Sequence, residues 1–233
     1  MISRSEMHNG VTPAIGDCVY TSCYCEENVW KLCDFVRREQ TAPLDQLDVV
    51  FISNENRTVR TLENVENLRL IKLMVLYVLQ VPLWEQKSGQ GEEPVIWDYH
   101  VVLLQTVPQS GYLIYDLDSE LPFPCHANIY IHKALRSDQN LKPQYHRKLR
   151  VIPANDFLSR FSSDRSHMKN SDGTWKMPPP PYPPISTAEC QTNLEDFISV
   201  SPFVGWGVVY SLQSFTHRYS PSPASSSAGP AHP

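Results

Sequence analysis

Long apolar runs are missing from this chain of 233 residues, and its most apolar stretch, Leu68–Leu83, is interrupted by Arg69 and Lys72. A membrane-spanning helix needs about 20 predominantly apolar residues, so no membrane association is expected. The N-terminal stretch also lacks the apolar centre of a secretory signal peptide. We therefore expect a reducing compartment: the cytoplasm, with the nucleus as an additional location.

Positive charge is in deficit, with 20 basic against 25 acidic residues and a formal net charge of −5. A general nucleic-acid binder normally carries a basic patch or stripe, so no nucleic-acid partner is expected.

The chain also contains no C-x-x-C pair. Its six cysteines are expected to be free thiols, metal ligands or catalytic groups rather than a disulfide framework. They are Cys18, Cys23, Cys25, Cys33, Cys125 and Cys190.

Length and composition predict one catalytic domain at residues 17–219, after a flexible N-terminus at 1–16 and before a low-complexity, disordered tail at 220–233. Apolar spacing and capping residues predict a long helix over Tyr24–Glu39. Predicted strands are Leu47–Ser53, Val95–Leu104, Tyr112–Leu117, Arg150–Pro153 and Gly205–Leu212, and predicted short helices are Asn128–Arg136, Asp156–Phe161 and Asn193–Ile198. Periodicity leaves Leu68–Leu83 open between a strand pair and a buried helix.

Two surface features have alternative interpretations. The Pro178–Pro184 run is polyproline-like, and it suits either an SH3- or WW-type partner or a strap packed on the domain, which we favour. The basic run Lys142–Arg150 is expected to be solvated. Surface positions are likewise expected for the histidines in polar or terminal contexts, which are His8, His126, His132, His146, His167, His217 and His232.

Two titratable residues lie inside predicted apolar strands, His100 in Val95–Leu104 and Asp116 in Tyr112–Leu117. An unpaired buried polar group costs roughly 1–3 kcal/mol, so we expect the two to be partners. If they face each other across an antiparallel hairpin, Gln105 pairs with Gly111 and Thr106–Ser110 forms the loop. Asp98 and Asp118 are the rival acids. The alternative for His100 is a core histidine bonded to a carbonyl, and the alternative for Asp116 is an acid in a turn.

Cys25 is the candidate nucleophile because it falls in the first turn of the predicted helix, where the helix dipole and a nearby imidazolium stabilise a thiolate. A cysteine, histidine and aspartate in this chain order match the catalytic groups of papain-like thiol hydrolases. Cys23 is the rival nucleophile, and Cys33 is expected in the core. The alternative for Cys25 is a structural role as a small apolar residue of the helix.

A zinc site is the second possibility for these cysteines. Cys18, Cys23, Cys25 and Cys33 with His100 supply the ligand types that structural zinc prefers. A C-x-C pair at a helix start is poor tetrahedral geometry, however, so we expect no metal and no cofactor.

The pentapeptide Trp97-Asp98-Tyr99-His100-Val101 resembles the signature of the WDYHV-motif family, the protein N-terminal glutamine amidohydrolases. The resemblance extends over most of residues 17–219, through Ser22–Cys33, Val49–Glu55, Tyr115–Asp118, Leu121–Cys125, Ser163–Lys169, Pro178–Pro183 and Gly205–Gly207. It implies an α+β fold with a papain/transglutaminase-like cysteine hydrolase core, in which an antiparallel sheet packs against an N-terminal helix carrying the nucleophile. It also implies that the family's catalytic triad falls on Cys25, His100 and Asp116.

The activity implied by this resemblance is deamidation of an N-terminal glutamine in proteins or peptides, which feeds the arginylation branch of the N-degron pathway. No cofactor is implied, and a monomer is expected. Residues 56–80 form an atypical insertion relative to that family. The alternatives are another papain-like thiol hydrolase or a transglutaminase on the same triad, or an inactive variant that acts as an interaction module through its proline run.

Overall fold

The computed structural model describes residues 10–55 and 81–220, which form an α+β fold on a six-stranded antiparallel sheet. Its strands are β1 (Leu47–Asn54), β4 (His100–Val107), β5 (Gly111–Tyr115), β6 (Cys125–His126), β7 (Arg147–Pro153) and β8 (Val208–Ser211). Their order is β6-β5-β4-β1-β7-β8, which places β4 and β1 at the centre. A separate two-stranded sheet pairs β2 (Val81–Leu83) with β3 (Val95–Trp97).

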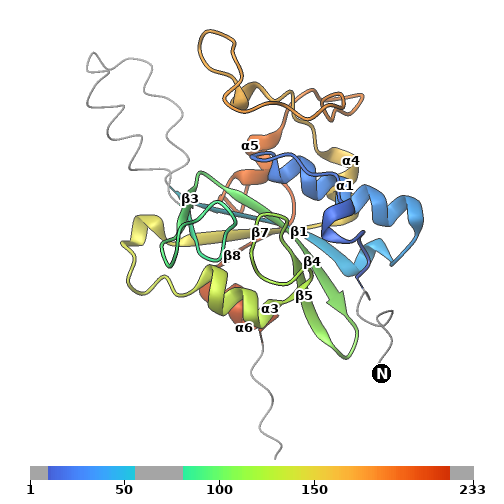
Figure 1. Ribbon diagram of the computed structural model, residues 1–233. Coiled ribbons are helices and arrows are strands. Elements are labelled where there is room, and N and C mark those ends of the chain that lie inside the picture. The colour runs from blue at the N-terminus through green and yellow to red at the C-terminus, as the bar shows by residue number, and fades with distance from the viewer. Residues whose placement is uncertain (1–9, 56–80, 221–233) are drawn as a thin grey trace, which may run out of the picture.

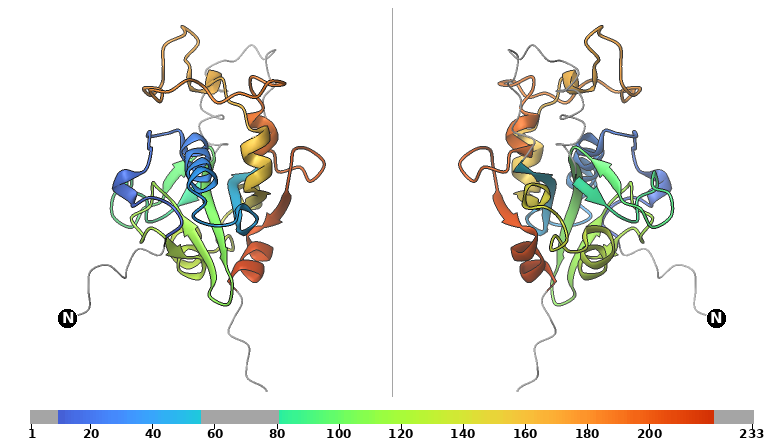
Figure 2. Two further views of the ribbon diagram at one scale, coloured as in Figure 1. Left: turned by 90° about the vertical axis from the view of Figure 1, so that its right-hand side faces the viewer. Right: turned by 90° about the vertical axis from the view of Figure 1, so that its left-hand side faces the viewer.

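Helices cover both faces of the large sheet (Figures 1 and 2). They are α1 (Cys25–Glu39), α3 (Ala127–Tyr130), which continues as a π-helical turn (Ile131–Leu135), α4 (Ala154–Arg160), α5 (Leu194–Ile198) and α6 (Leu212–Tyr219). Figure 1 shows α1, α4 and α5 above the sheet and α3 and α6 below it. Within the described ranges no helix is long and apolar enough to cross a bilayer.

The central strand β1 explains why the sheet is covered twice. Alternate side chains point to opposite faces of a strand. Val49 and Phe51 accordingly lie in the core that contains α1, whereas Val50 and Ile52 lie in the core that contains α3 and α6. All four are fully buried, and each buried apolar side chain stabilises the fold by roughly 1.5–3 kcal/mol. An apolar run in this position therefore requires a helix layer on each side.

The predicted hairpin is present, but its register differs from the prediction. Gln105 pairs with Leu113 and Val107 pairs with Gly111, so the loop is Pro108–Ser110 and two residues shorter than predicted. The shorter loop is possible because Gln109 and Gly111 both adopt positive φ, at 64° and 95°. A shift of two residues leaves each side chain on its original face.

The predicted strand Val95–Leu104 is wrong as a single element. It breaks at Asp98 and Tyr99 because its first part pairs with β2, whereas His100 pairs with Ile52 of β1. The break makes Asp98 an exposed residue rather than a neighbour of His100 on the same face of one strand.

The expectation that Lys142–Arg150 is solvated is also wrong for its two arginines. Arg147 and Arg150 are only 0% and 2% exposed, because β7 lies between β1 and β8. Arg147 bonds Asp138, and Arg150 donates three hydrogen bonds to backbone carbonyls. These acceptors inside the fold pair with part of the five N–H donors that each guanidinium carries.

The proline-rich strap, Met177–Ile185, packs on the domain, which confirms the interpretation that we favoured. Pro180 is buried, and Lys31 Nζ of α1 lies 4.0 Å from the centre of the Tyr182 ring. Tyr24 donates a hydrogen bond from its hydroxyl group to the Met177 carbonyl at 3.2 Å. The strap therefore lies over the start of α1.

Predictions for residues 1–9, 56–80 and 221–233 fall outside the described residues. These include most of the flexible start, the insertion and the tail. Residues 10–16 are described, and the Val11 N–H donates to the Tyr115 hydroxyl at 3.4 Å. The domain limits of 17 and 219 stay a prediction.

Candidate active site

Three structural elements bring the predicted site residues to the buried part of the fold. Cys25 is the first residue of α1, His100 begins β4, and Asp116 directly follows β5. They are 7%, 0% and 5% exposed, respectively. His100 Nε2 lies 2.9 Å from Asp116 Oδ1, so the predicted contact between these two side chains is present.

The orientation of the His100 ring is fixed from several sides. The Trp97 ring stacks on it, with centroids 5.4 Å apart and 24° between the planes. Nε2 faces the Asp116 carboxylate, whereas Nδ1 is buried without a hydrogen-bond partner among the described residues. A neutral imidazole that donates from Nε2 carries its free electron pair on Nδ1. Nδ1 is thus the nitrogen that can accept a proton.

Asp116 is held by donors from three other residues. The Tyr130 hydroxyl donates to Oδ2 at 2.7 Å, and Gln86 Nε2 donates to the same oxygen at 3.3 Å. The backbone N–H of Asp118 donates to Oδ1 at 3.0 Å. Hydrogen bonds to an ionised carboxylate favour its charged form.

The charges of this pair support each other. Burial lowers the pKa of His100, but Asp116, and then Asp118 and Glu26, outweigh burial, so that this pKa is raised above its ordinary value. Burial also opposes the charge of Asp116, but His100, Tyr130 and the Asp118 N–H hold the pKa of Asp116 below its ordinary value. Asp116 is therefore a carboxylate at neutral pH and stabilises an imidazolium.

Cys25 lies beside the strand that begins with His100. A backbone hydrogen bond from Val101 favours its thiolate, but burial, and then the charges of Glu26 and Asp118, raise the pKa of the thiol well above its ordinary value. The thiolate that we expected the helix dipole and a nearby imidazolium to stabilise is therefore not the resting state. The resting group is a neutral thiol that needs a base to remove its proton.

The start of α1 offers hydrogen-bond donors close to this thiol. Tyr24 is the N-cap and its side chain makes no capping bond, so the first backbone N–H groups of the helix have no side-chain acceptor there. Such groups bind developing negative charge. The rival nucleophile Cys23 lies before the helix, half-buried and with φ of 67°, and its Sγ contacts Ser22 Oγ at 3.6 Å.

Glu26, an acid in the first turn of α1, is a fully buried neighbour of the thiol. Its Oε2 lies 3.7 Å from Cys25 Sγ and accepts a hydrogen bond from the Tyr99 hydroxyl at 2.9 Å. Its Oε1 lies 3.5 Å from His167 Nε2. The surface position expected for His167 is wrong, because its side chain is only 13% exposed. Sequence patterns do not show contacts between residues so far apart in the chain.

The zinc set proposed from the cysteines is not brought together in the described part of the chain. There, the one group with metal-ligating side chains close together is His100, Asp116 and Asp118, whose ligand atoms lie within 4.8 Å of one another. It contains no cysteine. His100 Nε2 and Asp116 Oδ1 are bonded directly to each other, so this arrangement suits a hydrogen-bonded pair better than a metal site.

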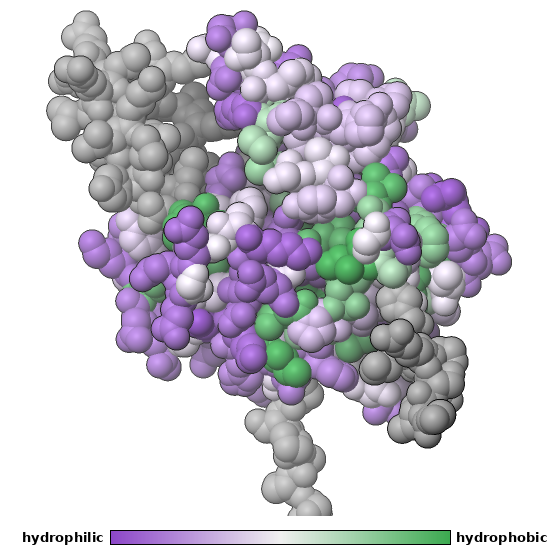
Figure 3. Space-filling model, viewed as in Figure 1, coloured by the Kyte–Doolittle hydropathy of each residue, from purple (hydrophilic) through white to green (hydrophobic). Residues whose placement is uncertain are grey.

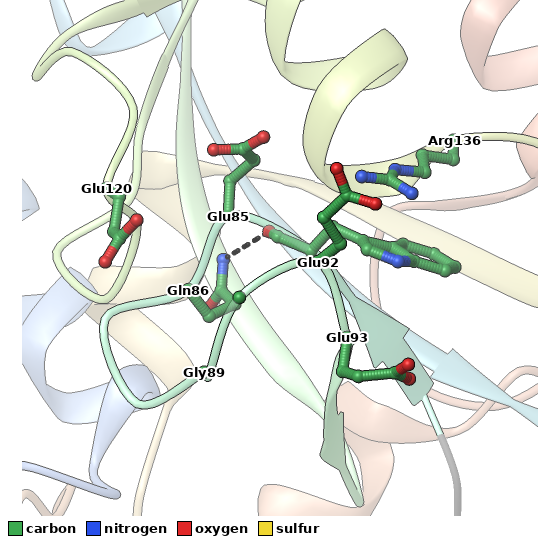
Figure 4. A pocket seen from close by; sticks show the side chains of 9 residues that line it. Glu85, Gln86, Gly89, Glu92, Glu93, Glu120 and Arg136 are labelled. Atoms are coloured by element: carbon green, nitrogen blue, oxygen red, sulfur yellow. Dashed lines mark hydrogen bonds between the residues drawn. The ribbon is translucent and has the colours of Figure 1, made fainter.

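Gln86 lines a small pocket of about 140 Å³ (Figure 4) and also donates a hydrogen bond to Asp116 Oδ2. Its lining carries four glutamates and one arginine, namely Glu85, Glu92, Glu93, Glu120 and Arg136. None of Cys25, His100 and Asp116 lines it. The outer surface in Figure 3 is mostly hydrophilic, with apolar surface scattered near its middle.

Comparison with known proteins gives one consistent result. The family model described as N-terminal glutamine amidase matches residues 20–77 and 74–219. A Danio rerio relative named protein N-terminal glutamine amidohydrolase is 49% identical over 217 residues, or 93% of this chain and 96% of that protein. A Homo sapiens relative of the same name is 47% identical, over 89% of this chain and 91% of its own. A relative of the same name from Drosophila ananassae is 45% identical, over 91% of this chain and 93% of its own length.

Proposed function

This chain belongs to the N-terminal glutamine amidase family, a family of amide hydrolases, and we propose that it deamidates N-terminal glutamine in proteins and peptides. The products are N-terminal glutamate and ammonia. The observation that carries the chemical proposal is the buried His100 Nδ1, which has no partner in the described structure while Nε2 is bonded to Asp116. In the proposed reaction this nitrogen is the base that takes the proton of Cys25, the neutral thiol at the start of α1.

The first half of the proposed reaction transfers the acyl group to Cys25. His100 Nδ1 takes the thiol proton, and the sulfur attacks the side-chain carboxamide carbon of the substrate. Backbone N–H groups at the start of α1 stabilise the resulting oxyanion. The imidazolium then gives its proton to the amide nitrogen. The C–N bond breaks, ammonia leaves, and a γ-glutamyl thioester remains.

The second half hydrolyses this thioester. His100 Nδ1 removes a proton from a water molecule, and the water oxygen attacks the thioester carbon. The C–S bond breaks, the sulfur recovers the proton from the imidazolium, and the side chain leaves as a carboxylic acid that ionises. Asp116 holds the Nε2 tautomer and stabilises the imidazolium in both halves.

We also propose that this architecture is a papain/transglutaminase-like cysteine hydrolase core. A nucleophile at the start of α1, a histidine that begins the central strand β4 and an acid after the neighbouring strand β5 support this proposal. No cofactor enters the proposed reaction. The proposed substrate is a polypeptide with a free N-terminal glutamine.

The cellular part of the proposal is that the product feeds the arginylation branch of the N-degron pathway. We propose that the enzyme works as a monomer in the cytoplasm and also in the nucleus. All six cysteines are free thiols, which suits a reducing compartment.

Mass spectrometry of peptides treated with the purified chain tests the function. A peptide that begins with glutamine is expected to gain about one dalton and to release one equivalent of ammonia, since an amide becomes a carboxylate. The same peptide with an internal glutamine serves as the control and is expected to stay unchanged. Cleavage of the backbone would identify a protease instead, cross-linking a transglutaminase, and unchanged peptides an interaction module.

A further inference from the structure

The surroundings of the thiol and the imidazole carry an excess of negative charge. Four carboxylates act on these two groups, namely Glu26, Asp98, Asp116 and Asp118. Apart from His100, Lys87 is the cation that acts on Asp118, and its Nζ is bonded to the Leu117 carbonyl. A partly buried site with more carboxylates than cations favours a positively charged ligand.

Three of the four carboxylates are poor candidates to bind that ligand. Asp116 accepts hydrogen bonds at both oxygens, from His100 at Oδ1 and from Tyr130 at Oδ2. Glu26 Oε2 accepts a hydrogen bond from the Tyr99 hydroxyl and Oε1 lies 3.5 Å from His167 Nε2, so both oxygens already face a partner. Asp98 is exposed, and water screens its charge.

Asp118 differs from these three. It is 8% exposed, which leaves it reachable but largely removed from water. The Tyr20 hydroxyl donates to its Oδ1 at 2.5 Å and fixes the carboxylate, whereas Oδ2 accepts no hydrogen bond from the residues that the structure describes. Tyr20 itself is 45% exposed, so this carboxylate lies just inside the surface.

We propose that Asp118 binds the free α-ammonium group of the substrate and thereby restricts the enzyme to N-terminal glutamine. This inference rests on the function proposed above. Four bonds separate the α-nitrogen of glutamine from its carboxamide carbon, so the two atoms are at most roughly 5 Å apart at about 1.5 Å per bond. The Asp118 carboxylate has an oxygen within 4.8 Å of a ring nitrogen of His100. A carboxamide placed at the thiol and imidazole therefore leaves its ammonium group within reach of Asp118.

The same contact couples recognition to reactivity. Asp118 is one of the charges that raise the pKa of the Cys25 thiol, and a bound ammonium group neutralises that charge. Loss of the thiol proton is then easier in the complex than in the free enzyme. An internal or N-acetylated glutamine brings no positive charge, so it gains neither the ion pair nor this activation.

Two matched peptides test the proposal. One begins with glutamine, and the other begins with the same residue lacking its α-amino group, a 4-carbamoylbutanoyl peptide. Ammonia release gives kcat/KM for both. Asp118→Asn is expected to lower kcat/KM for the glutamine peptide about 10- to 100-fold, the range for a lost hydrogen bond between charged groups. Its effect on the peptide without an amine is expected to stay within about 3-fold, so the preference between the peptides collapses.

Further variants separate binding from folding. Tyr20→Phe keeps the carboxylate and removes the hydroxyl that fixes it, so it is expected to lower the preference by a smaller factor. Asp98→Asn is the matched control, because it removes a carboxylate near the same thiol. Equal losses on both peptides in Asp118→Asn, or a preference that collapses in Asp98→Asn instead, would overturn the proposal.

Calorimetric measurement of peptide binding to Cys25→Ala tests recognition of the ammonium group without catalysis. This variant is expected to bind the glutamine peptide about 10- to 100-fold more tightly than the peptide without an amine, and the added Asp118→Asn change should abolish the difference. If the unsubstituted enzyme releases no ammonia but Cys25→Ala still prefers the amine, the proposed reaction is wrong and the ammonium site stands. If both peptides bind equally to Cys25→Ala, the ammonium site is wrong.

Discussion

Replacing Asp116 with asparagine removes the charge beside His100 while it keeps a side chain of the same shape. Two unit charges 2.9 Å apart attract by about 6 kcal/mol at an effective dielectric constant of about 20. Burial of both groups offsets part of this attraction. If about 4 kcal/mol of it stabilises the imidazolium in the transition state, its loss lowers the rate about 10³-fold, at 1.36 kcal/mol per factor of ten.

The assay is ammonia release from a glutamine-initiated peptide between about pH 5 and pH 10, where the acid limb of kcat/KM reports the pKa of the essential base in the free enzyme. Asp116 raises the pKa of His100, and the reaction needs unprotonated His100. Removal of Asp116 lowers that pKa, so His100 stays unprotonated to lower pH. Asp116→Asn is therefore expected to lower kcat/KM about 10³-fold and to move the acid limb to lower pH.

Asp156→Asn is the control, because it also breaks a carboxylate–cation pair, at 3.5 Å from Arg160, but on the exposed face of α4. An exposed ion pair of this kind contributes little to stability. The rate and pH profile of Asp156→Asn are therefore expected to match those of the unsubstituted enzyme. A loss of less than about tenfold in Asp116→Asn, or an acid limb that does not move, would refute the coupling of Asp116 to the catalytic base.

Two further predictions concern the surroundings of the site. Arg165→Met leaves Glu27 buried without the bonds at 2.7 and 2.8 Å, so it should lower the free energy of unfolding in urea by about 3–5 kcal/mol, and adding Glu27→Gln should restore part of it. No restoration would contradict the importance of that buried pair. Dialysis against a chelator should leave ammonia release unchanged, because His100 Nε2 and Asp116 Oδ1 bond each other. Loss of activity with recovery on added zinc would contradict this.

Local patterns were enough to predict the elements that carry the site. Apolar spacing predicted α1 to within one residue at its start, and with it the position of Cys25 in the first turn, whereas the expected capping side chain is absent because the N-cap is Tyr24. Alternation predicted that His100 and Asp116 face each other, because a register error of two residues leaves side chains on the same face. The strand break at Asp98 could not be predicted, because it depends on pairing with β2 from another part of the chain.

Contacts between distant segments account for the remaining errors. Arg147 looked solvated because charge is normally exposed, and only its place on an inner strand buries it. His167 comes to Glu26 through the folding of a long loop that has no periodic pattern. The raised pKa of the Cys25 thiol follows from burial and from Glu26 and Asp118, and a linear sequence does not show how these groups are arranged in space.

The role of Cys25 is tested most directly by ammonia release from a glutamine-initiated peptide in two single variants, Cys25→Ala and Cys23→Ala. The two thiols are two residues apart, but only Cys25 lies in α1 and beside Val101. Cys25→Ala is expected to abolish ammonia release, and Cys23→Ala to retain it. Ammonia release that survives in Cys25→Ala and disappears in Cys23→Ala would contradict the assignment of the nucleophile.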